Sequence, residues 1–396
     1  MSAKKIKVAG VGCCLVDRIY DEVDFKSETF AKYISRVHGD GGLIPGALEF
    51  EENLERFAGR KFVEILPELT SGKKEDKENV GGPCIVALIN AAQMTSGRAE
   101  YSFYGCSGDD RVGDDLRNAL SRTPVKLDHY RIESGAETAS TTVLSDPAFD
   151  DGHGERIFVN TIGASWKYLP EELDASFYAS DIVVFGGTAL VPSIHKDLDK
   201  LLLKAKNAGC LTIVNTVYDT LDDRANLGRR WPLGSSDKSY ESIDLLIADR
   251  EEALHLSGCD TINEALEFFR DKGTKAAIVT NGCKDTSYYS AGEIFKKVAD
   301  SKMPVSEAVN ERLRKGNVKG DTTGCGDNFV GGVIASVASQ TFEGREELDL
   351  SEACCWGTVC GGFACFYYGG TFIEQHPGEK SELVKPYYDA FLKQIQ

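Results

Sequence analysis

Short runs of apolar and β-branched residues alternate with segments of helical periodicity along most of the chain. The apolar runs are Ile6–Val11, Ile182–Phe185, Leu211–Val214, Leu245–Ala248 and Ala276–Thr280, and the clearest helical segments are Ser193–Asn207, Ile262–Lys272 and Asn328–Ala338. Strands that alternate with helices predict βαβ units and a mainly parallel sheet covered on both faces. In such sheets ligands bind beyond the carboxyl ends of the strands, and there this sequence places Gly, Asn, Asp and Thr.

Two regions depart from this alternation. Residues 18–80 are polar and poorly periodic, with a Glu-rich helical patch at Leu48–Phe57 and a charged run, Lys73–Glu78, typical of a solvated loop. Residues 128–167 contain two β-branched runs, Thr138–Leu144 and Arg156–Asn160, on either side of an acidic turn, which predicts a β-hairpin. We expect His153 in that turn to be a solvent-facing loop residue.

The pattern therefore predicts an α/β fold of three αβα layers around a mainly parallel central sheet, with a small β-containing lid. We expect residues 1–17, 81–127 and 168–396 to form the large domain. We expect residues 18–80 and 128–167 to form the lid.

Charge and apolar content exclude several classes of function. Lys plus Arg number 45 and Asp plus Glu number 62, so the net charge is −17. A negative field of this size repels phosphate backbones and anionic lipid, so we expect neither nucleic-acid nor membrane binding. No apolar run approaches the roughly 20 residues that span a bilayer. Gly10, Gly12 and Asp17 interrupt the one basic-apolar stretch near the start, which favours a cytoplasmic first strand over a secretory signal.

Twelve cysteines are too dilute in a chain of 396 residues for a disulfide framework. No CxxC pair occurs and the six histidines are scattered, so a structural zinc site is not expected. The spacing of Cys355, Cys360 and Cys365 is more typical of a helix face of small residues than of a redox switch.

A glycine-rich segment, Gly320–Asp327, leads directly into a predicted helix. Unpaired amides and the positive end of the dipole favour an anion at a helix start. Gly324 and Gly326 allow the backbone to approach a phosphate closely. Asp327, in the first turn, is placed to accept a proton from a substrate hydroxyl, although an acid there is also common as a plain helix-capping residue.

The stretch from Asp321 to Asp327 (DTTGCGD) resembles the DTxGAGD signature of the ribokinase-like (PfkB) carbohydrate and nucleoside kinase family, with Cys325 in place of the usual Ala. Other motifs of that family recur in the same order: Gly10–Asp17, Asn79–Pro83, Gly105–Gly113, Asp249–Glu252 (Asp for the Asn of NxxE) and Thr280–Gly282. The resemblance covers nearly the whole chain outside residues 25–78, and on it the chain is identified as a member of this family.

The resemblance implies a role for each matching residue. Asp327 is the expected catalytic base, and the amides of Gly324, Cys325 and Gly326 are the expected anion hole for the transferring phosphoryl group. Residues expected to bind ATP are Asn215, Thr280, Gly282 and Thr323. Residues expected to hold the phosphate acceptor are Asp17, Gly81 and Gly82.

The resemblance also implies cations. Glu252 is the expected ligand of Mg²⁺, through water, because Mg²⁺ prefers oxygen ligands and keeps several waters. Asp321, with Thr323, is the expected contact of a monovalent cation such as K⁺. Taken alone, Asp249–Glu252 is more typical of acids in the first turn of a helix than of a metal ligand. Arg156 fits either a substrate contact or an exposed arginine of the lid.

The motifs indicate the reaction more clearly than they indicate the phosphate acceptor. Family members selective for ribose carry Asn where this chain has Leu15 and Val86, so ribokinase activity proper is not expected. We expect transfer of the γ-phosphate of ATP to a hydroxyl of a sugar or sugar acid, with a nucleoside (adenosine-like) kinase as the alternative. A silent binding protein is disfavoured because Asp327 is retained. The sequence leaves a homodimer open.

Overall fold

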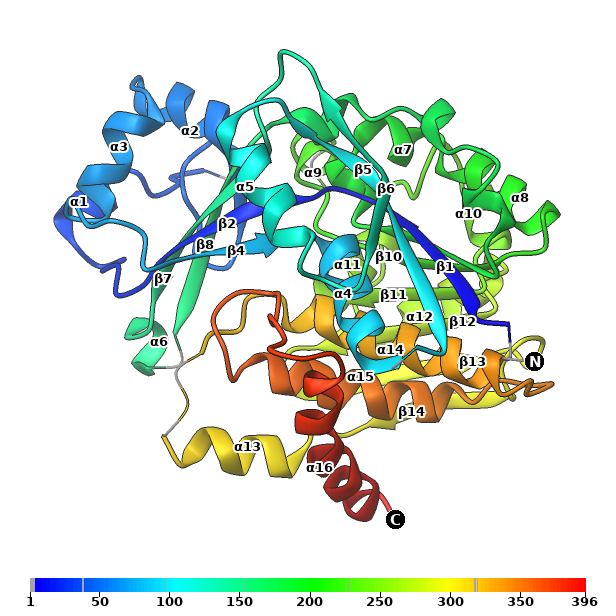
Figure 1. Cartoon of the computed structure of the whole chain (residues 1–396). Helices are drawn as coiled ribbons and strands as arrows, with labels where there is room; N and C mark the ends of the chain where they lie inside the picture. Colours follow the sequence, from blue (N-terminus) through cyan, green and yellow to red (C-terminus); the bar gives the residue numbers. More distant parts are fainter. Residues whose placement is uncertain are drawn as a thin grey trace.

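The computed structural model describes residues 4–37, 39–95, 97–152, 154–226, 228–316, 318 and 320–396. His153 lies outside the described residues. Figure 1 shows the chain as a large sheet flanked by helices, with a smaller sheet and its helices at one end.

In the described part of the chain, nine strands form the large sheet. In spatial order they are β14 (Val298–Met303), β13 (Lys284–Ser290), β12 (Ala276–Asn281), β11 (Leu245–Asp249), β10 (Leu211–Asn215), β9 (Ile182–Gly186), β1 (Ile6–Val11), β5 (Ala99–Gly108) and β6 (Lys126–Glu133). All neighbours from β12 to β6 pair in parallel, and β13 and β14 add an antiparallel edge. The predicted mainly parallel sheet is confirmed.

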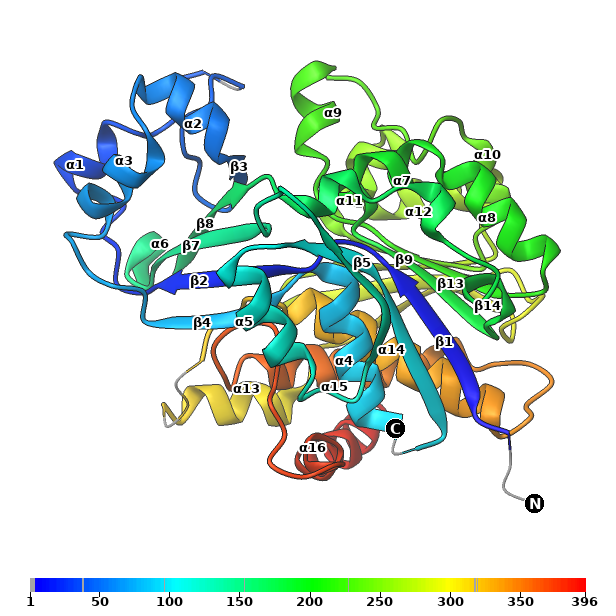
Figure 2. The ribbon, with the colours of Figure 1, turned by 45° about the horizontal axis from the view of Figure 1, so that its top comes forward.

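Helices cover both faces of this sheet (Figure 2). One face carries α4 (Pro83–Thr95), α5 (Arg111–Leu120), α13 (Glu307–Arg314), α14 (Cys325–Phe342), α15 (Leu350–Ala364) and α16 (Glu379–Gln394). The other carries α7 (Pro192–Lys196), α8 (Leu198–Asn207), α9 (Thr220–Ala225), α10 (Lys238–Glu241), α11 (Arg250–Ser257) and α12 (Ile262–Asp271). Short 3₁₀ helices are η1 (Ala164–Lys167), η2 (Pro170–Glu172), η3 (Phe177–Ala179) and η4 (Thr188–Leu190). Apolar side chains on alternate positions of the strands fill a separate core on each face.

A second sheet, of five strands within the described residues, lies at one end of the large sheet (Figure 1). Its order is β3 (Leu48–Phe50), β8 (Glu155–Thr161), β7 (Ser140–Asp146), β2 (Leu15–Tyr20) and β4 (Lys77–Gly81). The helices α1 (Glu28–Ala31), α2 (Glu51–Ala58), α3 (Phe62–Leu69) and α6 (Phe149–Gly152) belong to the same end of the molecule. A third apolar core, which includes Phe30, Leu54 and Ile157, holds these parts together.

The structure corrects two boundaries of the predicted lid. β6 pairs in parallel with β5, so residues 128–133 belong to the large sheet. β2 is one continuous strand from Leu15 to Tyr20 and pairs with β4 up to Gly81, so both strands run across the expected boundaries. Strand pairing is a tertiary contact, and the local polarity on which the boundaries rested does not report it.

Two helix predictions are also corrected. Ser193–Asn207 forms two helices, which separate at Asp197, where the backbone leaves helical geometry. The patch Leu48–Phe57 begins as strand β3 before α2 starts at Glu51, because β8 offers Leu48–Phe50 a strand to pair with. The hairpin is confirmed, since β7 and β8 pair antiparallel. No helix in the described part of the chain is both long and apolar enough to cross a bilayer.

Candidate active site

The predicted phosphate loop leads into α14, which begins at Cys325. Gly324 has a φ of +73°, and a Cβ there would lie 2.3 Å from the Cα of Gly370, so only glycine fits. Cys325 N–H donates to the Thr322 carbonyl at 3.3 Å. In the described part of the chain, the amides of Gly324 and Gly326 make no hydrogen bond. The start of α14 therefore keeps free donors for an anion.

Asp327 lies in the first turn of α14 and interacts electrostatically with a second carboxylate, Asp17 of β2. Burial raises the pKa of Asp327 to about 6. Burial, followed by the charges of Asp327 and Asp321, raises the pKa of Asp17 to about 8. The Asp17 carboxylate packs against Gly81, where a Cβ would lie 2.2 Å from Asp17 Oδ2. The fold thus brings the base predicted on α14 and the acceptor residues predicted on β2 and β4 together.

Asp321 and Thr323 form the outer part of the loop. Asp321 Oδ1 accepts from the amides of Thr323, at 2.9 Å, and Gly369, at 3.2 Å. Asp321 Oδ2 is buried and has no hydrogen-bond partner among the described residues. Arg156 of β8 donates from Nη1 to Thr323 Oγ1 at 3.3 Å. The sequence left Arg156 open between two roles, and the structure places it on the phosphate loop.

The predicted nucleotide residues lie at the carboxyl ends of neighbouring parallel strands. Asn215 ends β10, and Thr280, near the end of β12, pairs with Asp249 of β11. The Asn215 side chain is buried, and its Oδ1 has no partner among the described residues. Gly282 occupies the exposed turn after β12 with a φ of +57°. These positions line one edge of the sheet, as parallel topology requires.

The position of Glu252 is compatible with both roles that the sequence suggested, a ligand of Mg²⁺ and an acid in the first turn of a helix. It caps α11 reciprocally with Asp249, whose side chain accepts from the Glu252 amide at 2.8 Å. It is also buried, and burial followed by the charge of Asp249 raises the pKa of Glu252 to about 8. The charge of Asp327 contributes as well, so Glu252 belongs to the same acidic cluster. Thr216 Oγ1 donates to Glu252 Oε2 at 2.5 Å.

Two further residues, Asn328 and Lys380, stabilise the loop through hydrogen bonds. The Asn328 Nδ2 donates to the carbonyls of Gly324, at 2.8 Å, and Gly370, at 2.7 Å. The buried Lys380 donates to Asn328 Oδ1 at 2.7 Å, and burial lowers the pKa of Lys380 to about 8. An ammonium only donates, so Lys380 fixes which end of the amide faces the two glycines. Nothing local in the sequence marks Lys380, because it comes from the last helix.

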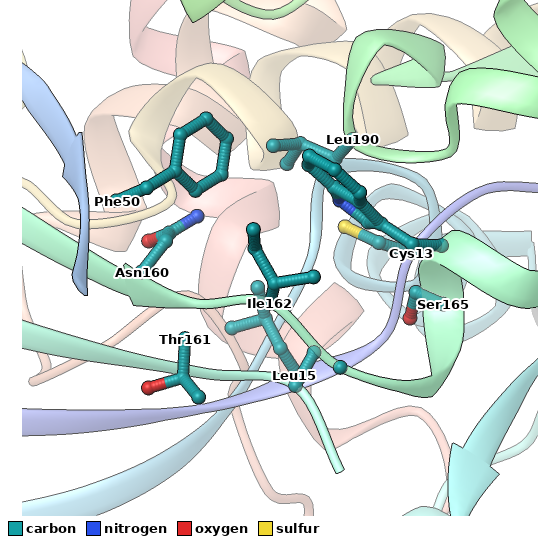
Figure 3. Close-up of a pocket in the computed structure, with 11 residues that line it drawn as sticks. Cys13, Leu15, Phe50, Asn160, Thr161, Ile162, Ser165 and Leu190 are labelled. Carbon is teal, nitrogen blue, oxygen red and sulfur yellow. The ribbon is translucent and has the colours of Figure 1, made fainter. Parts of the chain in front are cut away.

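A pocket lies beside β2 (Figure 3). Its lining residues are Cys13, Leu15, Phe50, Ala139, Asn160, Thr161, Ile162, Gly163, Ser165, Trp166 and Leu190. Burial raises the pKa of the Cys13 thiol well above its usual value, and the charges of Asp327 and Asp17 add to the shift. Leu15, which lines the cavity, and Asp17 both pack against Gly81, so the cavity lies near the Asp17 carboxyl group. Within the described residues, Asn160 Oδ1 and Ser165 Oγ are buried without a hydrogen-bond partner.

Comparison with known proteins identifies the family. The model of the pfkB family carbohydrate kinases matches residues 60–376. The chain belongs to this family. It is therefore a phosphotransferase that acts on a hydroxyl group, and its expected sugar-kinase function is confirmed at this level.

Individual relatives agree with the family. Fructokinase from Solanum tuberosum is 28% identical over 290 residues, which cover 71% of this chain and 78% of the relative. The structure of adenosine kinase from Sinorhizobium meliloti aligns with a TM-score of 0.69 at 19% identity, covering 97% of this chain and 99% of that one. A ribokinase-type protein from E. coli in complex with ATP and Mg²⁺ aligns with a TM-score of 0.62 at 17% identity, covering 97% and 99%. These structures confirm the ribokinase-like fold.

Proposed function

We propose that this pfkB kinase transfers the γ-phosphate of ATP to a hydroxyl of a sugar or sugar acid, with Asp327 as the base. The observation that carries the proposal is the position of Asp327, in the first turn of a helix whose Gly324 and Gly326 amides are free, in electrostatic contact with Asp17. A carboxylate there accepts the proton of an acceptor hydroxyl. The free amides stabilise charge on the transferring group.

The acidic cluster supports the use of cations. Asp17, Asp327 and Glu252 all have raised pKa values, and the charge of Asp327 repels those of Asp17 and Glu252. No group of three or more His, Cys, Asp or Glu side chains within the described residues is arranged to hold a metal ion by itself. This fits Mg²⁺ held by Glu252 through water and by phosphate oxygens, where it neutralises phosphate charge. The unpartnered Asp321 Oδ2 fits a monovalent cation such as K⁺.

The nucleotide side of the site follows from the strand ends. We assign Asn215 to the phosphates of ATP, because it ends β10 at the carboxyl edge of the sheet and its Nδ2 group can donate to phosphate oxygens. Thr280 and Gly282 line the remaining nucleotide surface, and Thr323 closes the site on the lid side.

The cavity beside Asp17 supports a polyhydroxylated acceptor. Asn160 Oδ1 and Ser165 Oγ offer unused hydrogen-bonding groups to acceptor hydroxyls, and the Solanum tuberosum relative is a fructokinase. We therefore rank a ketohexose first. A nucleoside remains the second candidate because Phe50 and Trp166 meet edge to face in the same cavity, with ring centroids 5.5 Å apart, and offer aromatic surface to a base.

A panel of acceptors tests the assignment. ADP release is measured with fructose, other hexoses, a sugar acid, ribose, adenosine and inosine, and the phosphorylated product is identified by mass spectrometry. We expect a sugar or sugar acid to give a kcat/KM at least tenfold above either nucleoside. Preference for adenosine would transfer the assignment to the second candidate, and turnover of no acceptor would contradict the proposal.

Two variants of the cavity sharpen this test. Ser165→Ala removes a hydroxyl partner, whereas Trp166→Leu removes aromatic surface. For a sugar acceptor, Ser165→Ala raises KM by more than Trp166→Leu does. For a nucleoside the order is reversed, because stacking on an aromatic ring then supplies much of the binding.

A further inference from the structure

The phosphate loop contains a thiol that touches a second thiol. Cys325 Sγ and Cys365 Sγ are 3.3 Å apart, and neither cysteine is in a disulfide. Cys325 is the first residue of α14, and Cys365 caps the end of α15. Both are partly exposed, whereas Cys355 and Cys360 are buried in the core as their helical spacing predicts. Cys365 therefore does not pack in the core as Cys355 and Cys360 do.

The surroundings of the pair favour thiol chemistry. The hydrogen bond between the two thiols lowers the pKa of Cys365, against the rise that burial causes. The positive charge of Arg156, which reaches the same loop from the lid, lowers it further. A thiolate is the form of cysteine that attacks a peroxide. A second thiol within contact distance can then resolve the oxidised product.

We propose that Cys325 and Cys365 form a reversible disulfide when the protein meets hydrogen peroxide or an organic hydroperoxide, and that this bond disables the anion hole. The Cys365 thiolate attacks one peroxide oxygen, the O–O bond breaks, and a sulfenic acid forms, with hydroxide leaving from hydrogen peroxide or an alkoxide from an organic hydroperoxide. The Cys325 sulfur then attacks the sulfenic sulfur. An S–S bond forms, the S–O bond breaks, and the oxygen leaves as water with the Cys325 proton. Two thiols are oxidised and one peroxide is reduced.

The disulfide would displace the loop. A disulfide is about 2.05 Å long, so the two sulfurs must approach by more than about 1 Å. Gly324, beside Cys325, is packed against Gly370, and Gly320 is packed against the Cys365 carbonyl, where a Cβ would lie 2.3 Å from that oxygen. The first turn of α14 has to absorb the movement. A displacement of about 1 Å at reacting groups can cost roughly 100-fold in rate.

Peptide mapping of the oxidised protein is the direct test. The full-length protein is treated with hydrogen peroxide, remaining thiols are blocked, and the products are measured by mass spectrometry. We expect a linked peptide containing Cys325 and Cys365 and an intact mass lower by two hydrogen atoms. Dithiothreitol should restore both thiols. Absence of the linked peptide under conditions that oxidise Cys259, a partly exposed single cysteine, would overturn the proposal.

A kinetic arm, which rests on the proposed function, tests the effect on the anion hole. Oxidation should lower kcat at least tenfold, and dithiothreitol should restore it. After peroxide treatment, Cys365→Ser should keep its activity. Cys259→Ser should be inactivated by the same treatment, like the wild type. Equal inactivation of Cys365→Ser, or a disulfide without loss of kcat, would contradict the second half of the proposal.

The peptide-mapping test and the kinetic test can fail independently of each other. Disulfide formation is read from mass alone and does not depend on any acceptor, so failure of the proposed kinase function leaves it intact. If Cys365→Ser does not fold, as judged by thermal unfolding, Cys365→Ala replaces it, and the wild-type peptide map decides the first half by itself.

Discussion

Arg156 Nη1 lies 3.3 Å from Thr323 Oγ1, so strand β8 of the smaller sheet contacts the loop that precedes α14. The positive charge of Arg156 also opposes the rise that burial causes in the pKa of Asp321. A second contact of the same kind joins Glu49 of β3 to Arg224 of α9. The smaller sheet therefore contacts the large domain at the loop before α14 and at α9, and we propose that it helps to exclude water from the phosphoryl group.

Replacement of Arg156 tests whether its contact with Thr323 helps to keep water away from the phosphoryl group. We expect Arg156→Ala to lower kcat/KM for the acceptor at least tenfold and to raise the share of ATP that is hydrolysed without transfer, because the hairpin no longer holds the loop. The measurement compares ADP release with sugar phosphate formed. Arg18→Ala is the matched control, since Arg18 pairs with Glu78 at the surface of the same sheet. Unchanged coupling in Arg156→Ala would show that this contact plays no part in closure.

Replacement of Asp327 tests the base. We expect Asp327→Asn to lower kcat by about 10²–10⁴, the usual contribution of a general base, while ATP affinity measured by calorimetry stays nearly intact. Burial raises the pKa of Asp327 to about 6, and only its ionised form accepts a proton. The wild-type rate should therefore fall as pH decreases through about 6, and the residual rate of the variant should lack this limb. Turnover of Asp327→Asn within tenfold of wild type would exclude Asp327 as the base.

Asp17 predicts a pH-dependent cost in stability. Its pKa is about 8 in the folded protein and 3.8 as the reference value, so between these pH values the folded state holds a proton that the unfolded state has lost. The free energy of unfolding therefore decreases as pH rises through this window. Asp17→Asn removes the effect, so the variant should gain stability relative to wild type between pH 4 and pH 8, by at least about 1 kcal/mol at the upper end.

Chemical denaturation at several pH values measures this difference. A constant difference between Asp17→Asn and wild type across the whole range would contradict the assigned burial of the charge. Acceptor turnover should fall in the same variant, because position 17 then offers the acceptor an amide in place of a carboxyl group.

Substitution of two glycines in the loop should affect the stability of the fold differently. Gly324→Ala meets both a φ of +73° and the Cα of Gly370, so we expect it to destabilise the protein by about 1–3 kcal/mol and to lower kcat. Gly326→Ala meets no atom within 4 Å and no unfavourable φ, so its stability should match the wild type. Thermal unfolding of both variants makes the comparison. Equal destabilisation would show that the loop relaxes more freely than the close contact of Gly324 with Gly370 implies.

The sequence alone determined the βαβ alternation, the hairpin and the phosphate loop, because each depends on residues close together in the chain. Apolar periodicity marks a strand or helix locally, and the glycine-rich approach to Asp327 is one continuous segment. The family motifs likewise located Asp17 and Glu252. Potassium use, the cytoplasmic location and a homodimer stay predictions.

Only the tertiary structure decided which distant segments meet. The pairing of β6 with β5, the reach of Arg156 to Thr323, the support of Asn328 by Lys380 and the contact of Cys325 with Cys365 each join residues that no local pattern connects. The physical reason is that such contacts depend on how sheets and helices pack. Packing is satisfied by shape and burial summed over the whole chain, so a single position carries little trace of it.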